Sequence, residues 1–177
     1  MLNRLKKDLP KGGGRLYSAY LLLKLLHVLA VVAFLGNISM GLFWKAIADR
    51  SGRAEIVAHT LRGIILSDRL ITIPSIVVIL IAGFGAASIG GWKILGTGWI
   101  LWSLVLFIIA GLAFPPVSRA QRELAELAAA GGPGLVASEP YRRLSHTWEL
   151  WGTVALVAPL LALVLMVLKP TLIALHR

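Results

Sequence analysis

The sequence predicts an all-α membrane protein, built as an antiparallel bundle of four transmembrane helices. Two observations lead to this fold class. The chain is 58% hydrophobic by composition and has a mean hydropathy of +0.82, which is well above the values of an ordinary soluble domain. It also contains four segments of 19 to 25 residues without Asp, Glu, Lys or Arg, and a bilayer core needs about 20 such residues per helix. These segments are residues 25–44, 70–92, 94–118 and 150–168.

The chain divides into one membrane domain and two tails. Residues 1–18 form a basic amino-terminal tail, residues 19–170 form the membrane domain, and residues 171–177 form a carboxy-terminal tail. Each connection joins neighbouring spans, so we expect an up-down-up-down course with both termini on one side of the membrane. The expected spans are about 20–44, 70–92, 98–118 and 148–168.

Local signals mark the ends of these spans. The segment 51–69, between the first two spans, is polar but still has a helical pattern. Pro74 lies near the start of the second span and predicts a kink, because its ring removes one backbone hydrogen bond. Trp92, Trp99 and Trp102 cluster around the turn between the second and third spans, as is typical of an aromatic belt at a membrane interface.

The net charge of +10 indicates a membrane partner more than a nucleic acid. The basic residues lie in tails and loops beside hydrophobic spans, where they can meet anionic lipid headgroups. Eight of them flank the spans on the side of the termini and nine on the opposite side, so counting does not fix the orientation. The dense basic tail before the first helix favours a cytoplasmic amino terminus in a bacterial inner membrane. A homo-oligomer or another membrane subunit stays open as a partner.

An ionisable side chain within a membrane helix is costly and therefore a candidate for function. His27 lies about two turns inside the first span, and Lys24 precedes it near the interface. An imidazole there can be the axial ligand of a haem iron, with the lysine meeting a porphyrin carboxylate. Met166 and Lys169, on the antiparallel fourth helix, are expected at the same depth as His27 and Lys24. Met166 is then a weaker second ligand of the iron, and Lys169 is a second contact for a porphyrin carboxylate. The alternative is that His27 only hydrogen-bonds to a neighbouring helix.

A second group of polar residues is expected on the opposite side of the membrane. His146 and Glu149 are three residues apart and share a helical face. Such a group can clamp an anionic ligand or line an aqueous vestibule, and the alternative is that its arginines meet lipid phosphates. The group consists of His59, Arg62, Asp68, Arg69, His146 and Glu149.

Cysteine is absent, which excludes disulfides, iron–sulfur clusters and thiolate zinc sites. No nucleotide-binding glycine loop, zinc-protease motif or nucleophile elbow is present either. The chemistry of common soluble enzymes therefore finds no support in the sequence.

Two resemblances add to these observations. Lys24-Leu-Leu-His27, followed by Ala33-Phe-Leu-Gly36, resembles the first helix of a superfamily that includes the HemJ-type membrane protoporphyrinogen oxidases and the copper-resistance D-type proteins. Over residues 19–170 the chain resembles an uncharacterised family of predicted four-helix bacterial membrane proteins. That likeness rests on Asp68-Arg69, Thr72-x-Pro74, Pro116 with Gln121, and Met166-Val-Leu-Lys169-Pro170.

The HemJ-type resemblance implies haem b as the ligand of His27 and leaves open a porphyrinogen oxidase activity or another haem-dependent redox activity. The sequence therefore predicts a membrane protein that binds haem b or a related tetrapyrrole through His27. The alternatives are a small transporter or channel component, or a structural membrane subunit without a cofactor.

Overall fold

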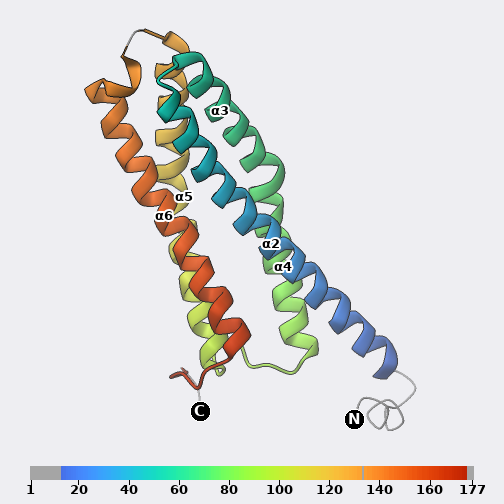
Figure 1. Cartoon of the computed structure of the whole chain (residues 1–177). Helices are drawn as coiled ribbons and strands as arrows, with labels where there is room; N and C mark the ends of the chain where they lie inside the picture. The colour runs from blue at the N-terminus through green and yellow to red at the C-terminus, as the bar shows by residue number, and fades with distance from the viewer. Residues whose placement is uncertain (1–12, 133, 175–177) are drawn as a thin grey trace.

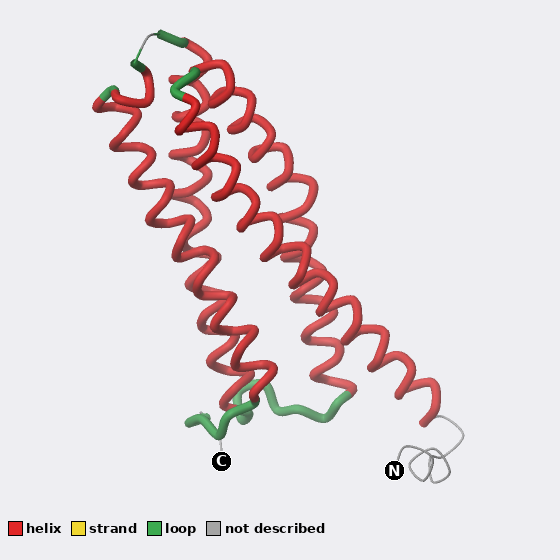
Figure 2. The backbone as a smooth tube through the Cα atoms, viewed as in Figure 1, coloured by secondary structure: helices red, strands yellow, loops and turns green. Residues whose placement is uncertain are grey.

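The computed structural model describes residues 13–132 and 134–174, which form helices and no strand (Figure 2). The expected all-α class is therefore confirmed. In chain order the elements are α2 (Gly13–Ser51), α3 (Ala54–Ser67), the π-helix η1 (Asp68–Thr72), α4 (Ile73–Ile89), α5 (Gly98–Ala130), the 3-10 helix η2 (Leu135–Ala137) and α6 (Glu139–Leu168).

These elements form four long rods, because α3, η1 and α4 follow one another without a break (Figure 1). Each rod is long and apolar enough to cross a bilayer. The start of α2 and the end of α6 lie at the same end of the molecule, as the antiparallel course requires. We call this the terminal end.

The rods are longer than a membrane is thick. The 39 residues of α2 span about 58 Å, whereas the hydrocarbon core is about 30 Å thick. The surplus of α2 lies at both of its ends. At the end opposite the termini, the rods extend through residues 45–69 and 119–149, which we call the head. Seven of the eight acidic residues of the chain fall within the head, so this part faces water.

The head has a hydrophobic core of its own. Leu61 of α3 and Leu124 of α5 are fully buried in it, and Ala48 at the end of α2 packs against them. The polar segment 51–69 is thus helical, as expected, but it belongs to the second rod. That rod begins at Ala54 and not near residue 70, and only a tight turn at Gly52, where φ is +64°, separates it from α2.

Helices α5 and α6 pack closely because small residues line their shared face. Ala113 of α5 is fully buried, and Ala158 and Ala162 of α6 are nearly so. Small side chains let two backbones approach within a membrane, where lipid removes the hydrophobic drive for association. The Ser103 hydroxyl also lies within hydrogen-bond distance of the Ala162 carbonyl oxygen, at 3.2 Å.

Toward the terminal end the bundle separates into two pairs, α2 with α4 and α5 with α6 (Figure 1). The pairs still meet at mid-height, where the Phe34 and Phe107 rings lie 6.0 Å apart. Within the first pair, side chains of α2 pack directly against Gly83 and Gly85 of α4, because glycine has no Cβ atom. A Cβ atom at Gly83 would lie 2.9 Å from the His27 ring, and one at Gly85 would lie 3.0 Å from Leu23.

The distortion expected at Pro74 takes the form of the π-helix η1, which ends two residues before this proline. The Ile73 amide donates to the Asp68 carbonyl, five residues back and not four. Proline has no amide hydrogen, so the usual α-helical ladder cannot continue through this turn. A one-turn π-helix accommodates the gap, and such turns are frequent at functional sites.

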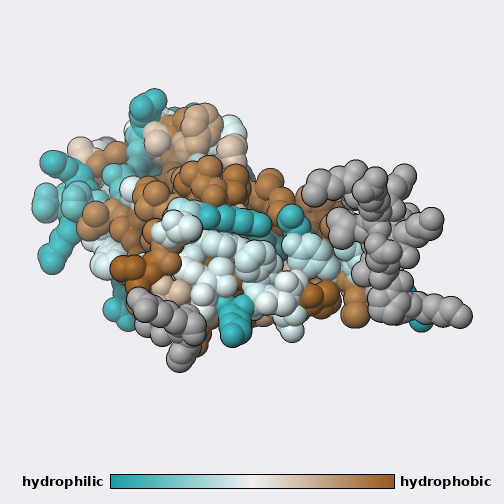
Figure 3. Space-filling view, turned by 90° about the horizontal axis from the view of Figure 1, so that it is seen from below, coloured by the Kyte–Doolittle hydropathy of each residue, from teal (hydrophilic) through white to brown (hydrophobic). Residues whose placement is uncertain are grey.

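The chain returns to the terminal end at Lys169. Its ammonium nitrogen lies 5.5 Å from the Trp92 ring and 5.3 Å from the Trp99 ring, and the Trp102 indole donates to the Ile173 carbonyl at 3.2 Å. Seen from this end, near-white residues of intermediate hydropathy lie between brown hydrophobic surfaces (Figure 3). Lys169 and Ile173, after the end of α6, therefore contact the three tryptophans of the predicted aromatic belt.

Enlarging a residue in the α5–α6 contact should destabilise the bundle. Ala113→Leu adds three carbons where the structure has no space, and overpacking costs about 1–3 kcal/mol. The measurement is unfolding of the purified protein in detergent. The neighbouring Leu112, which is 70% exposed on the lipid side, provides the control, because Leu112→Ala should change stability by less than about 0.5 kcal/mol. Equal effects of the two substitutions would contradict the packing.

Candidate functional site

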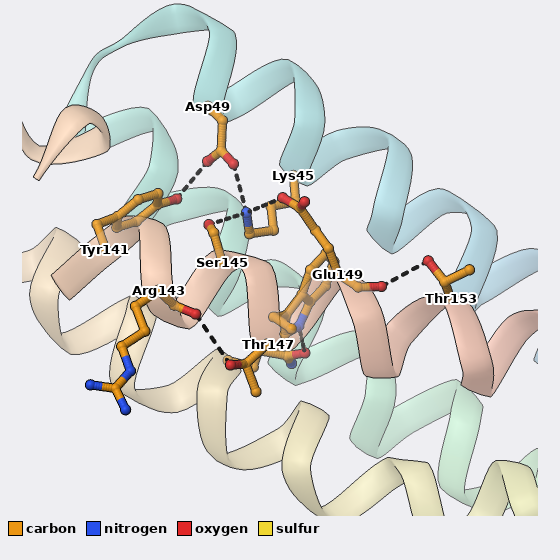
Figure 4. Close-up of polar contacts among 10 residues, drawn as sticks. Lys45, Asp49, Tyr141, Arg143, Ser145, Thr147, Glu149 and Thr153 are labelled. Atoms are coloured by element: carbon orange, nitrogen blue, oxygen red, sulfur yellow. Dashed lines mark hydrogen bonds and ion pairs between the residues drawn. The ribbon is translucent and has the colours of Figure 1, made fainter. Parts of the chain in front are cut away.

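Polar side chains inside the head meet around one buried lysine (Figure 4). Lys45, near the end of α2, is 1% exposed. Its ammonium nitrogen lies 2.6 Å from Asp49, 2.7 Å from Ser145 and 3.5 Å from Glu149. An ammonium group has three hydrogens to donate, and these three oxygens take them all. We call this group, with Tyr141, the Lys45 cluster.

Aromatic rings complete the surroundings of Lys45. Its nitrogen lies 5.6 Å from the centre of the Tyr141 ring and 5.2 Å from that of Trp148, within range of cation–π attraction. The Tyr141 hydroxyl donates to Asp49. Tyr141 precedes the apolar part of α6, and burial, with Asp49 beside it, raises the pKa of its hydroxyl. The tyrosine therefore remains a neutral donor in this bond.

A second group of polar side chains gathers around Asp68 in η1. Thr72 donates to the Asp68 carboxylate at 2.9 Å, Asn37 of α2 at 3.2 Å and Gln121 of α5 at 3.1 Å. Asn37 also donates to the Thr72 hydroxyl at 2.8 Å. We call these four residues the Asp68 cluster. It ties the first three rods together at the boundary between the head and the apolar part of the bundle.

One indole connects the two clusters. The Trp148 ring lies beneath Lys45, and its Nε1 donates to the Gln121 side-chain oxygen at 2.9 Å. Gln121 in turn donates to Asp68. All four rods therefore contribute to one chain of polar contacts that leads from Glu149 at the head surface to Asn37 inside the bundle.

His27 lies apart from these clusters, in the half of the bundle near the terminal end. Its Nδ1 is 2.9 Å from the Ile79 carbonyl oxygen of α4, and the ring rests against Gly83. A carbonyl oxygen can only accept, so Nδ1 carries the hydrogen. In the neutral ring the lone pair is then on Nε2. The hydrogen bond to a neighbouring helix, expected as the alternative to metal binding, is present and leaves Nε2 available.

The other residues expected around a haem are dispersed. Lys24 is exposed one turn before His27. Lys169 contacts the Trp92 and Trp99 rings, and Met166 lies one turn before it on α6. The end of α6 and the first half of α2 lie apart (Figure 1). The structure therefore places Lys24 with His27 but brings neither Met166 nor Lys169 to it.

The second predicted group is only partly brought together. Asp68 and Glu149 belong to the two connected clusters, and His146 lines an open depression of about 650 Å³ on the head together with Glu149. Helix α3 packs mainly on α5 and α2. The remaining members of the predicted group have exposed side chains outside both clusters: His59 and Arg62 on α3, and Arg69 on η1.

Sequence reasoning missed most of the polar chain. Lys45 entered the sequence analysis only as the charge that ends the segment 25–44 and as one of the nine basic residues opposite the termini, although Asp49 follows it at the four-residue spacing of a helical ion pair. Tyr141, Ser145 and Trp148 recur at four and three residues and therefore share one helix face. These spacings were the available signal for the Lys45 cluster.

The comparisons with known proteins address the family. Residues 21–170 match the family described as predicted integral membrane protein (DUF2269). The chain belongs to this family. No curated protein and no solved structure matches the chain. The match supports the likeness to an uncharacterised membrane family, whereas the HemJ-type and copper-resistance D-type likenesses gain nothing from it.

Removing the Lys45 charge should destabilise the bundle strongly. Lys45→Met keeps the length of the side chain but leaves Asp49 and Ser145 without their partner, and breaking a buried ion pair costs about 3–5 kcal/mol. Unfolding of the purified protein in detergent measures the loss. Lys93→Met, in the exposed turn between α4 and α5, is the matched control and should stay within about 0.5 kcal/mol of the unmodified protein. A loss below about 1 kcal/mol at Lys45 would refute its central role.

Proposed function

We propose that the protein binds haem b, or a related tetrapyrrole, through His27 in the membrane-embedded half of the bundle. The observation that carries this proposal is the hydrogen bond from His27 Nδ1 to the Ile79 carbonyl. Histidines that bind metal ions commonly donate their other ring hydrogen to a carbonyl or carboxylate, which fixes the tautomer and the orientation of the ring. His27 has this arrangement within an apolar span.

The surroundings of His27 support an apolar, planar ligand. Gly83 leaves room for the imidazole against α4, so the ring is held on one side by backbone. The α2–α4 pair diverges from the α5–α6 pair in this half of the bundle (Figure 1). Lys24 lies one turn nearer the terminal end, at a depth where it can meet a carboxylate.

The donor set fits a haem with one protein ligand on the iron. His27 would hold the iron through Nε2, and the carbonyl of Ile79 would make the imidazole a stronger donor. Bound haem supplies one-electron chemistry, and the protein sets its potential through the axial ligand and through burial. The likeness of Lys24-x-x-His27 to HemJ-type proteins supports the same ligand.

Absorption spectroscopy tests this proposal. Protein purified from cells with ample haem should show a Soret band that sharpens on dithionite reduction, and His27→Ala should abolish or shift it because the axial imidazole is lost. His59→Ala is the control, since His59 is exposed on the head, and it should leave the band unchanged. Lys24→Ala should weaken haem retention without changing the reduced spectrum. A colourless preparation, or a band that survives His27→Ala, would overturn the assignment.

Gly83→Ala gives a second test of the same site. The added Cβ would lie 2.9 Å from the His27 ring, so the ring must move. We expect a shifted reduced spectrum with most of the haem retained. Gly63→Ala, at a glycine with open space around its Cβ, should leave the spectrum as it is.

A small transporter or channel component is the second candidate, and one observation favours it. The polar chain from Glu149 to Asn37 enters the bundle from the head surface. It stops above the apolar layer of Phe34 and Phe107, so passage would require the two helix pairs to move. Ion flux into proteoliposomes, lowered by Asp68→Asn but not by His59→Ala, would support this function over haem binding. Flux that Asp68→Asn leaves unchanged would count against it.

A further inference from the structure

The Asp68 carboxylate lies half-buried in the bundle without a cation beside it. Among the described residues, no Lys, Arg or His nitrogen lies within 4.0 Å of its oxygens, and the neighbouring Arg69 side chain is exposed. Its partners Asn37, Thr72 and Gln121 are all neutral. A carboxylate in such a place is costly unless a positive charge compensates it.

The directions of the hydrogen bonds show that Asp68 only accepts. The Trp148 indole can only donate, so the oxygen of Gln121 faces it and the amide hydrogens of Gln121 face Asp68. Asn37 donates to the Thr72 hydroxyl, whose own hydrogen then goes to Asp68. Asp68 therefore accepts hydrogen bonds from three neutral side chains. A carboxylate accepts about four hydrogen bonds, so acceptor capacity remains.

The π-helix frees a backbone carbonyl in the residue that follows Asp68. In an α-helix the Arg69 carbonyl would accept from the Ile73 amide, but that amide donates to the Asp68 carbonyl. The residue five positions after Arg69 is Pro74, which has no amide hydrogen. Neither helical pattern supplies a donor to the Arg69 carbonyl. Freed carbonyls at broken membrane helices are typical ligands of alkali cations.

We propose that the Asp68 cluster is a binding site for a monovalent alkali cation such as Na⁺. The oxygens of this segment are the Asp68 carboxylate, the Thr72 hydroxyl and the freed Arg69 carbonyl. This is an all-oxygen set, as hard cations require. The bound ion supplies the positive charge that the carboxylate lacks.

The charge of the site selects a monovalent ion. Asp68 is the single acidic residue of the cluster, whereas sites for Ca²⁺ commonly combine several carboxylates. The nearest elements of the Lys45 cluster offer no further carboxylate, because Asp49 and Glu149 already bind the Lys45 ammonium. Lys45 compensates the acidic side chains of its own cluster, whereas among the described residues no basic side chain forms an ion pair with Asp68. The site stands independently of haem binding at His27.

Cation-dependent unfolding of the full-length protein in detergent tests this proposal. Sodium chloride replaces choline chloride at constant ionic strength and pH, and the melting temperature should rise and then saturate with Na⁺. Asp68→Asn should remove the sodium dependence altogether. Thr72→Val, which deletes one oxygen and keeps the shape, should raise the apparent Kd about tenfold, equivalent to about 1.4 kcal/mol.

Glu149→Gln is the matched control, because it neutralises an acid of the other cluster, and it should leave the sodium response intact. A sodium response that survives Asp68→Asn would place the ion elsewhere and overturn the proposal. A melting temperature that depends on pH but not on Na⁺, with the pH dependence lost in Asp68→Asn, would identify the Asp68 cluster as a proton site. That result would also overturn the proposal. Should Asp68→Asn fail to fold, an unchanged Kd in Thr72→Val would be decisive against it.

Discussion

The bundle depends on polar side chains that must find partners inside it. Lipid chains are as apolar as Leu or Val, so the membrane gives four helices little hydrophobic reason to associate. Lys45 is buried in the head, so without its partners its ammonium group would lie among the apolar side chains of the head core, and Asp68 lies at the boundary with the apolar part of the bundle. Their contacts reach all four rods through Gln121 and Trp148. This one chain of contacts sets the relative height and rotation of the helices.

The two ends of the molecule follow from different driving forces. The head lies outside the bilayer, where water drives the burial of Leu61, Leu124 and their neighbours into a core. The half near the terminal end lacks this drive, so the α2–α4 pair and the α5–α6 pair each stay together through small residues and diverge from each other. The packed head and the divergent helix pairs are therefore consequences of the same sequence. His27 lies in the half where the pairs diverge and Asp68 at the boundary.

The sequence predicted the parts of the fold that depend on composition along one helix. Charge-free segments located the four spans, and an even number of spans predicted that the first span begins and the last span ends on the same side of the membrane. The polar chain could not be predicted in this way, because Lys45 meets Ser145, and Asp68 meets Gln121, across gaps of 100 and 53 residues. His27 was found because one ionisable group in an apolar run is visible locally. Its partner, the Ile79 carbonyl, has no sequence signature, since every residue carries one.

The π-helix explains how one rod serves both the head and the membrane half. Each residue turns an α-helix by about 100°, so the extra residue that a π turn accommodates rotates everything after it relative to everything before. Before η1, α3 directs Leu61 into the head core, and after it α4 presents Ile79 and Gly83 to α2. A continuous α-helix would turn one of these faces away from its partner. Pro74 disfavours that continuous helix, and the Asp68 cluster holds the π turn in place through Asn37 and Gln121. The contacts of Asn37 with Asp68 and Thr72 and the hydrogen bond of His27 with the Ile79 carbonyl thus join α2 to the same rod on either side of Pro74.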